Sequence, residues 1–267
     1  ARIAIAALAS VGMLASVAAC GSGQSTSEKN GTIEVAASVN QWGTVAKALG
    51  GDNVNVTSII NSTNVDAHDY EPTTSDIAKL QKAQVIIVNG AGYDAWAVKA
   101  AQTANATIVN AAEVGGVNDG ENPHVWFSAD VRKAVAQAIT EAYEQADAAK
   151  KNDFDKMNDQ WTAEENNVES KIAEVKQKTD GLTYAATESV ASYLAEDMGL
   201  TDATPSGYAR ATANESEPTP TDIKQFTDAL KAGEIKLLVV NTQEESELTD
   251  KITDAAKSVE VPMVELT

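Results

Sequence analysis

From residue 31 onward the chain alternates short β-rich runs with helical stretches, and this alternation constrains the fold more than any other feature. The predicted strands of the first half are 32–38, 53–60, 84–89 and 107–110, and helical patterns cover 42–49 and 75–82. Strands that alternate with helices indicate βαβ units and a parallel sheet. We therefore expect segment 32–150 to form a first α/β lobe.

A second lobe is predicted to follow a long helix. Apolar residues recur at helical spacing over 129–149, a break is expected near 152–153, and the periodic, charged stretch 154–178 predicts a long helix. The alternation resumes with a strand at 182–187, a helix at 189–198 and a strand at 235–241. The expected fold is thus two βα lobes with parallel sheets, linked by a rigid helix (151–180), with the second lobe at 181–267 and a cleft between the lobes. A helical linker is stiff, so domain closure should be small.

One sequence pattern occurs in both halves. Glu71-Pro72 and Glu217-Pro218 each precede a threonine that lies three residues before an aspartate, Thr73 to Asp76 and Thr219 to Asp222. This spacing is typical of a capping box at a helix start. The repeat is explained equally well by duplication and by one good helix start used twice.

The charge of the chain excludes one class of partner. There are 39 acidic and 20 basic side chains, a formal net charge of −19. Such a surface repels nucleic acid phosphates, so nucleic acid binding is not expected. It attracts cations, although many secreted proteins are acidic for solubility alone.

The N-terminal segment has the pattern of an export signal. Residues 3–19 are nearly all apolar or small, too short to span a bilayer, and they end at Cys20, the single cysteine of the chain. Small residues before Cys20 resemble a bacterial lipobox, which predicts a signal peptide at 1–19, a lipid anchor on Cys20 and a flexible tether at 20–31. The protein is then expected outside the cytoplasm, held at the membrane by its N-terminal lipid.

Two histidines limit where imidazole chemistry can occur. His68 lies between a predicted strand and a capped helix, and His124 also lies in a loop before a helix. Loops of this kind gather ligands in parallel-sheet proteins. A lone loop histidine is more often a solvated side chain, however, and spacing alone does not decide between the two interpretations.

The residues around both histidines resemble a known family. His68-Asp69-Tyr70-Glu71-Pro72 and Asn122-Pro123-His124-Val125-Trp126 are similar to the two metal-binding loops of the manganese- and zinc-type solute-binding proteins of ABC importers. The resemblance extends from about residue 31 to the end and includes 89–96 and the Glu217-Pro218 helix start. It implies that His68 and His124 bind a metal directly.

The same resemblance implies a carboxylate ligand from the second lobe. Thr187-Glu188, followed by Tyr193-Leu194, matches the family's third ligand position, so Glu188 is assigned to the metal. Without the resemblance Glu188 is an ordinary acidic residue in a helical first turn. The family's fourth ligand, a carboxylate, is expected directly after residue 267, and Glu265 is left unassigned.

Two imidazoles and one or two carboxylates suit manganese, ferrous iron or zinc. Intrinsic affinity favours zinc, but zinc-type members usually have histidine at the third position and often a histidine-rich loop, and 111–120 contains no histidine. Manganese is therefore the favoured cargo and zinc the next.

The predicted function is capture of a divalent transition metal and its delivery to an ABC permease and its ATPase by a monomer, not an enzyme. Two alternatives stay open: a metal-dependent hydrolase, which also uses two histidines and a carboxylate, and a surface adhesin without a transport role.

Overall fold

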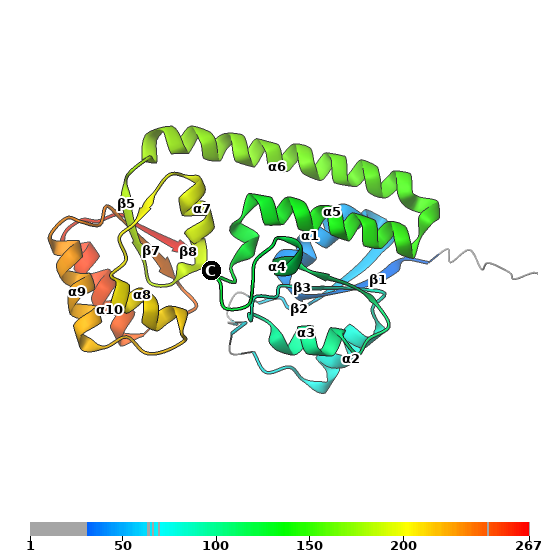
Figure 1. Ribbon diagram of the computed structural model, residues 1–267, viewed down its shortest axis with the longest axis horizontal. Helices are drawn as coiled ribbons and strands as arrows, with labels where there is room; N and C mark the ends of the chain where they lie inside the picture. Colours follow the sequence, from blue (N-terminus) through cyan, green and yellow to red (C-terminus); the bar gives the residue numbers. More distant parts are fainter. Residues whose placement is uncertain (1–30, 63–64, 66, 69, 245, 267) are drawn as a thin grey trace, which may run out of the picture. The chain divides into compact units, whose positions relative to one another are not determined.

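The computed structural model describes residues 31–62, 65, 67–68, 70–244 and 246–266. Within these residues two parallel four-stranded sheets are each flanked by helices, and a long helix, α6 (Lys151–Thr179), joins the two α/β lobes (Figure 1). The predicted fold class is confirmed. In the part of the chain that is described, no helix is both long and apolar enough to cross a bilayer.

The sheet of the first lobe has the order β2-β1-β3-β4, and all neighbouring strands are parallel. Its strands are β1 (Ile33–Val39), β2 (Val54–Ile60), β3 (Val85–Val88) and β4 (Thr107–Asn110). Its helices are α1 (Asn40–Gly50), α2 (Thr74–Lys82), α3 (Ala95–Ala101), α4 (Ala111–Val114) and α5 (Ala129–Ala146), with 3₁₀ turns η1 (Gly51–Asn53) and η2 (Val125–Phe127).

Strand β3 is buried on both of its faces, which explains why it is a continuous apolar run, Val85–Val88. Alternate residues of β3 point to opposite faces: Val85 and Ile87 pack in one core with α1, α5 and the start of α6, whereas Ile86 and Val88 pack in another with α2 and α3. Gly51 ends α1 at a φ of 52°, a conformation that an L side chain rarely adopts. The sheet is thereby held between two helical layers.

The second lobe repeats the same order as β6-β5-β7-β8, again with parallel neighbours. Its strands are β5 (Thr183–Ala186), β6 (Thr201–Asp202), β7 (Leu237–Asn241) and β8 (Met263–Leu266). Its helices are α7 (Ser192–Asp197), α8 (Ser206–Ala213), α9 (Pro220–Lys231) and α10 (Glu247–Ser258), with the 3₁₀ turn η4 (Ser189–Ala191). Both predicted capping boxes are formed, at Thr73 before α2 and at Thr219 before α9, so the repeated pattern occupies equivalent positions before β3 and β7.

The helices around the lobe junction differ in two details from the sequence prediction. The break between α5 and α6 lies at the 3₁₀ turn η3 (Ala148–Lys150) and not near 152–153, because the Asp147 carboxylate accepts the Ala149 N–H at 3.2 Å and starts the new turn. The helix predicted at 189–198 is divided into η4 and the shorter α7.

Candidate metal centre

The three side chains assigned from the sequence meet at one place. His68 follows β2, His124 immediately precedes η2, and Glu188 lies between β5 and η4. Loops after the carboxyl ends of parallel strands meet at one edge of a sheet, which brings such residues together. One ligand atom from each of the three residues lies within 4.8 Å of the others.

One carboxylate oxygen is common to both imidazoles. Glu188 Oε1 lies 3.2 Å from Nε2 of His124 and 3.8 Å from Nε2 of His68. Metal–ligand distances of about 2.0–2.2 Å place neighbouring ligand atoms about 3–3.5 Å apart, so the spacing is suited to a divalent ion between these atoms. Among the described residues, no other group of three or more histidine, cysteine or carboxylate side chains lies close enough together to hold a metal ion.

The Glu188 carboxylate is held in its charged form. Burial by itself raises the pKa of Glu188, but the hydrogen bond and charge that His124 supplies when its ring is protonated, the hydrogen bond from Asn241 and the charge of a protonated His68 outweigh burial and hold that pKa below its ordinary value. The Asn241 amide donates to Oε2, the second carboxylate oxygen. Glu188 therefore presents a fixed anionic oxygen to the two imidazoles.

The loop that carries His124 is fixed from the core of the first lobe. The Trp42 indole donates to Asn89 Oδ1 at 2.9 Å, and Asn89 Nδ2 donates to the Pro123 carbonyl at 2.9 Å. Trp42 and Asn89 are fully buried and His124 is 4% exposed. The position of His124 thus depends on the packed core, which favours a preorganised site.

Aromatic rings surround the imidazoles. The Tyr93 ring makes edge contacts with His68 and His124 at centroid distances of 4.6 Å and 5.8 Å, and Trp126 contacts His124 at 5.3 Å. These rings restrict rotation of the imidazoles and lower the local dielectric, which strengthens charge interactions within the site.

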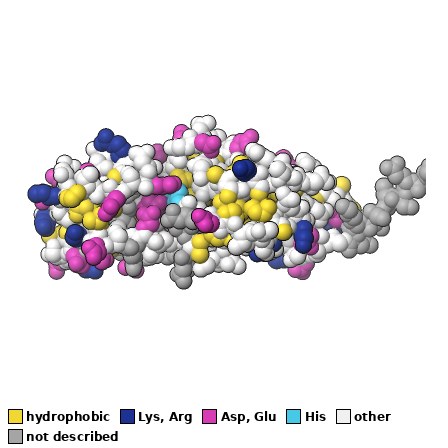
Figure 2. Space-filling model, turned by 90° about the horizontal axis from the view of Figure 1, so that it is seen from below, with side chains coloured by type: hydrophobic (Ala, Val, Ile, Leu, Met, Phe, Trp, Pro, Cys, Tyr) yellow, Lys and Arg dark blue, Asp and Glu magenta, His cyan; other side chains and the backbone are white. Residues whose placement is uncertain are grey.

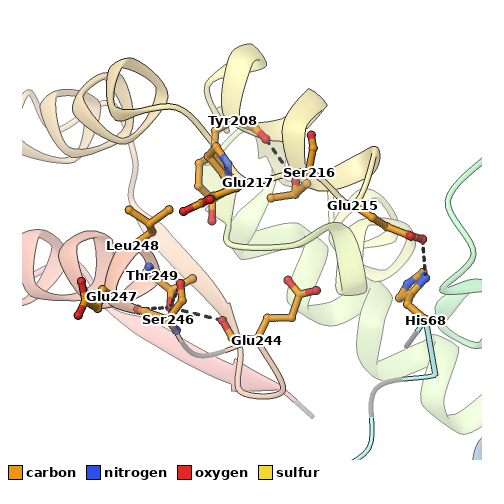
Figure 3. A pocket seen from close by; sticks show the side chains of 12 residues that line it. His68, Tyr208, Glu215, Ser216, Glu217, Glu244, Ser246, Glu247, Leu248 and Thr249 are labelled. Carbon is orange, nitrogen blue, oxygen red and sulfur yellow. Dashed lines mark hydrogen bonds and ion pairs between the residues drawn. The ribbon is translucent and has the colours of Figure 1, made fainter. Parts of the chain in front are cut away.

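His68 is the member of the trio that faces a cavity. A cavity of about 610 Å³ is lined by His68 and by several second-lobe residues, among them Glu215, Glu217, Glu244 and Glu247 (Figure 3). Glu215 Oε1 lies 3.2 Å from His68 Nδ1, on the other side of the ring from Glu188. Figure 2 shows a histidine at the surface beside a group of acidic side chains, an environment that attracts cations.

The sequence and the fold both match known proteins. The family model described as the periplasmic zinc-uptake complex component A matches residues 35–267, nearly all of the described chain. The chain belongs to this family.

Individual relatives of the family carry several metals in their names. The manganese ABC transporter substrate-binding lipoprotein PsaA of Streptococcus anginosus is 24% identical, over 84% of this chain and 77% of its own length. The iron ABC transporter substrate-binding lipoprotein MtsA of Streptococcus pyogenes is 25% identical, over 80% of this chain and 73% of its own.

Solved structures share the fold of this zinc-uptake family member. The periplasmic zinc-binding protein TroA of Treponema pallidum matches with a TM-score of 0.74 at 15% identity, covering 88% of each chain. The laminin-binding protein of Streptococcus agalactiae, described as having adhesin and metal-transporting activity, matches with a TM-score of 0.72 at 20% identity, covering 88% of this chain and 89% of its own.

The structure also identifies residues that the sequence prediction did not. Asn241, Glu215 and the side-chain amide of Asn122 contact the predicted trio, but only Asn122 lies in a motif that the sequence made visible. Cys20, the predicted lipid anchor, lies outside the described residues. Glu265, left unassigned above, is exposed on β8.

Proposed function

We propose that this protein is the extracytoplasmic metal-capture component of an ABC importer. It binds a divalent transition metal through Nε2 of His68, Nε2 of His124 and a carboxylate oxygen of Glu188, and delivers the ion to a membrane permease driven by an ATPase. The observation that carries the proposal is the approach of Glu188 Oε1 to both Nε2 atoms. When both Nε2 atoms carry lone pairs, they and the carboxylate oxygen repel one another unless a cation lies between them.

The site spans the two lobes, which explains how capture is transmitted. His68 and His124 come from the first lobe and Glu188 from the second, so a bound ion joins the lobes through two bonds to the first and one to the second. Contacts between the lobes already exist, since Gln243 Nε2 donates to the Val65 carbonyl at 3.2 Å. The ion therefore stabilises one arrangement of the lobes, and we propose that the permease recognises this arrangement.

Manganese is the cargo that we favour, with zinc next. The donor set holds no thiolate, and its mixture of imidazole and carboxylate suits manganese, iron and zinc. The acidic third ligand Glu188, in place of a third imidazole, moves the set toward harder donors. We further propose that the chain acts as a monomer, anchored through lipid on Cys20, and that it binds metal without turnover.

Metal binding by the purified chain tests this function. Protein stripped with a chelator is dialysed against matched free concentrations of manganese and zinc, and bound metal is measured by elemental analysis. We expect one ion per chain and a metal-dependent rise in unfolding temperature, with both lost in His124→Ala and Glu188→Ala. Absence of bound metal in the wild type would contradict the proposal. Zinc retained in preference to manganese would reverse the choice of cargo, and turnover of ester or phosphate substrates would instead indicate a hydrolase.

A further inference from the structure

The side chain of Asn122 bridges the two halves of the metal centre. Its Nδ2 donates to the carbonyl of Ser189, the residue after Glu188, at 2.8 Å, and its Oδ1 lies 2.7 Å from Nδ1 of His124. A carbonyl oxygen only accepts hydrogen bonds, so the amide nitrogen must face Ser189 and the amide oxygen must face His124. The backbone N–H of His124 also donates to Oδ1, at 3.1 Å, which agrees with this orientation.

This orientation decides which nitrogen of His124 carries a proton. An amide oxygen has no proton to give, so the 2.7 Å contact requires a proton on Nδ1. A neutral imidazole has a single N–H, and Nε2 then keeps its lone pair. That lone pair is directed toward Glu188 Oε1 at 3.2 Å, where a cation satisfies both groups.

We propose that Asn122 is a positioning residue for metal capture: it holds the proton of His124 on Nδ1 and so reserves Nε2 for the ion. The inference rests on the function proposed above and adds a residue that does not itself contact the metal. Partners that accept the second N–H of a ligating histidine fix the ring and raise its basicity.

The backbone of Asn122 is held in place as well. The Tyr193 hydroxyl, at the start of α7 in the second lobe, donates to the Asn122 carbonyl at 2.9 Å. Asn122 thus receives one hydrogen bond from the second lobe at its backbone and donates one to that lobe from its side chain. Its amide cannot turn without losing the bond to Ser189, which keeps the oxygen on His124.

His68 differs from His124 in the side chain that its Nδ1 faces. Its Nδ1 faces Glu215, whose side chain is 70% exposed and is therefore accessible to water and salt. The His124 ring is buried and its amide partner has no charge to be screened. The Asn122–His124 contact is consequently less screened than the Glu215–His68 contact, and Asn122 is the better candidate for a fixed positioning role.

Two substitutions of Asn122 separate its roles. Asn122→Ala removes the acceptor for His124, whereas Asn122→Asp keeps an acceptor oxygen there, loses the donor to Ser189 and adds a negative charge. Asn166→Asp, on an exposed position of α6, is the matched control for the added charge. Dissociation constants for zinc and for manganese are measured on the full chain by competition with a fluorescent chelator.

We expect Asn122→Ala to weaken the binding of both metals by about 10- to 100-fold, the usual effect of removing a partner of a metal-binding histidine. Asn122→Asp should recover most of this loss, and Asn166→Asp should bind as the wild type does. A purely structural role for Asn122 would lower the metal-free unfolding temperature of both Asn122 variants and would separate them little in affinity.

Nitrogen NMR of ¹⁵N-histidine-labelled, zinc-loaded protein gives a direct signature, because only two histidines contribute signals. In the wild type His124 should bind zinc through Nε2 and carry its proton on Nδ1, and that proton should exchange faster with water in Asn122→Ala. Coordination of His124 through Nδ1, wild-type affinity in Asn122→Ala, or equal weakening in both Asn122 variants would each overturn the inference. A wild type that binds neither metal overturns the proposed function, and the inference with it.

Discussion

The amide nitrogen of Asn241 donates to Oε2 of Glu188, while the other carboxylate oxygen, Oε1, faces the two imidazoles. Asn241 is the last residue of β7, and its backbone N–H donates to the Thr187 hydroxyl at 3.0 Å. Strand β7, an inner strand of the second sheet, therefore fixes the rotation of the Glu188 carboxylate. The histidines of the first lobe face this carboxylate.

Replacement of Asn241 by leucine tests this support. Asn241→Leu keeps a side chain of similar shape but removes the donor, so Glu188 should lose its fixed rotation and metal affinity should fall by about 10- to 100-fold. Asn166→Leu on the exposed face of α6 is the control and should bind normally. Isothermal titration calorimetry with zinc measures the dissociation constant of each variant. Unchanged affinity in Asn241→Leu would mean that Glu188 is oriented without the amide.

The cavity beside His68 offers a matched pair of glutamates. Glu215 contacts His68 Nδ1 at 3.2 Å, and Glu217 lines the same cavity. Glu215→Gln should weaken metal binding by less than about tenfold, because a contact at an exposed side chain is screened by water. The loss should shrink further in high salt, since exposed charges interact over about 10 Å at 0.1 M ionic strength.

Glu217→Gln removes the same charge from the same cavity without that contact. Dissociation constants at low and high salt distinguish the two variants. If both lose affinity equally, the cavity acts through its overall charge and not through the Glu215–His68 contact.

The sequence predicted most strands because their residues are buried on both faces of a sheet. The strand predicted at 84–89, for example, contains β3, in which all four residues are buried. Helix α8 was not predicted, since of its residues only Tyr208 is buried and the remainder are small or polar, which leaves little apolar periodicity. Helices α3 and α10 were not predicted either, although each buries three residues, two or three of them alanines.

The metal centre divides in the same way. His68, His124 and Glu188 lie in motifs that mark loops at strand ends, so the family resemblance was enough to assign them to one metal site. Asn241 and Glu215 act across the fold, 53 residues from Glu188 in the first case, and no neighbouring residue marks either of them. Residues that contact the site through packing between distant segments can be identified only from the three-dimensional structure.

The capping box at Asp76 predicts a pH dependence of stability. The hydrogen bond from the Thr73 hydroxyl lowers the pKa of Asp76; burial opposes it, and further bonds from the Thr73 N–H, Tyr70 and Lys79 hold that pKa well below its usual range. A depressed pKa stabilises the folded state above the unfolded pKa of about 3.9, and this stabilisation is lost as pH falls below that value.

Asp76→Ala should therefore lower the free energy of unfolding by about 1 kcal/mol at pH 7, the usual loss for a helix cap. The gap from the wild type should narrow at pH 3, where the wild-type carboxylate takes up protons on unfolding. Urea denaturation at both pH values measures this difference, and Asp222→Ala, in the less buried capping box before α9, is a milder comparison. A constant gap across this range would show that the charge of Asp76 contributes nothing.

A pair of core phenylalanines tests whether a bound ion joins the lobes. Phe154, at the start of α6, packs in the first lobe against Tyr143 at 5.4 Å between ring centroids, and Phe226 of α9 packs in the second; both are fully buried. Phe154→Ala and Phe226→Ala should each cost about 3–5 kcal/mol of unfolding free energy, through lost burial and the cavity left behind. Zinc at 100 times its dissociation constant should raise the free energy of unfolding of each variant by about 2.7 kcal/mol.

Because the ligands come from both lobes, zinc should raise the free energy of unfolding of both variants by the same increment. Adding His124→Ala to either variant should abolish this rise. Chemical denaturation with and without zinc provides the comparison. A rise confined to one variant would mean that the ion is held by one lobe alone, and Glu188 could not then share it with His68 and His124.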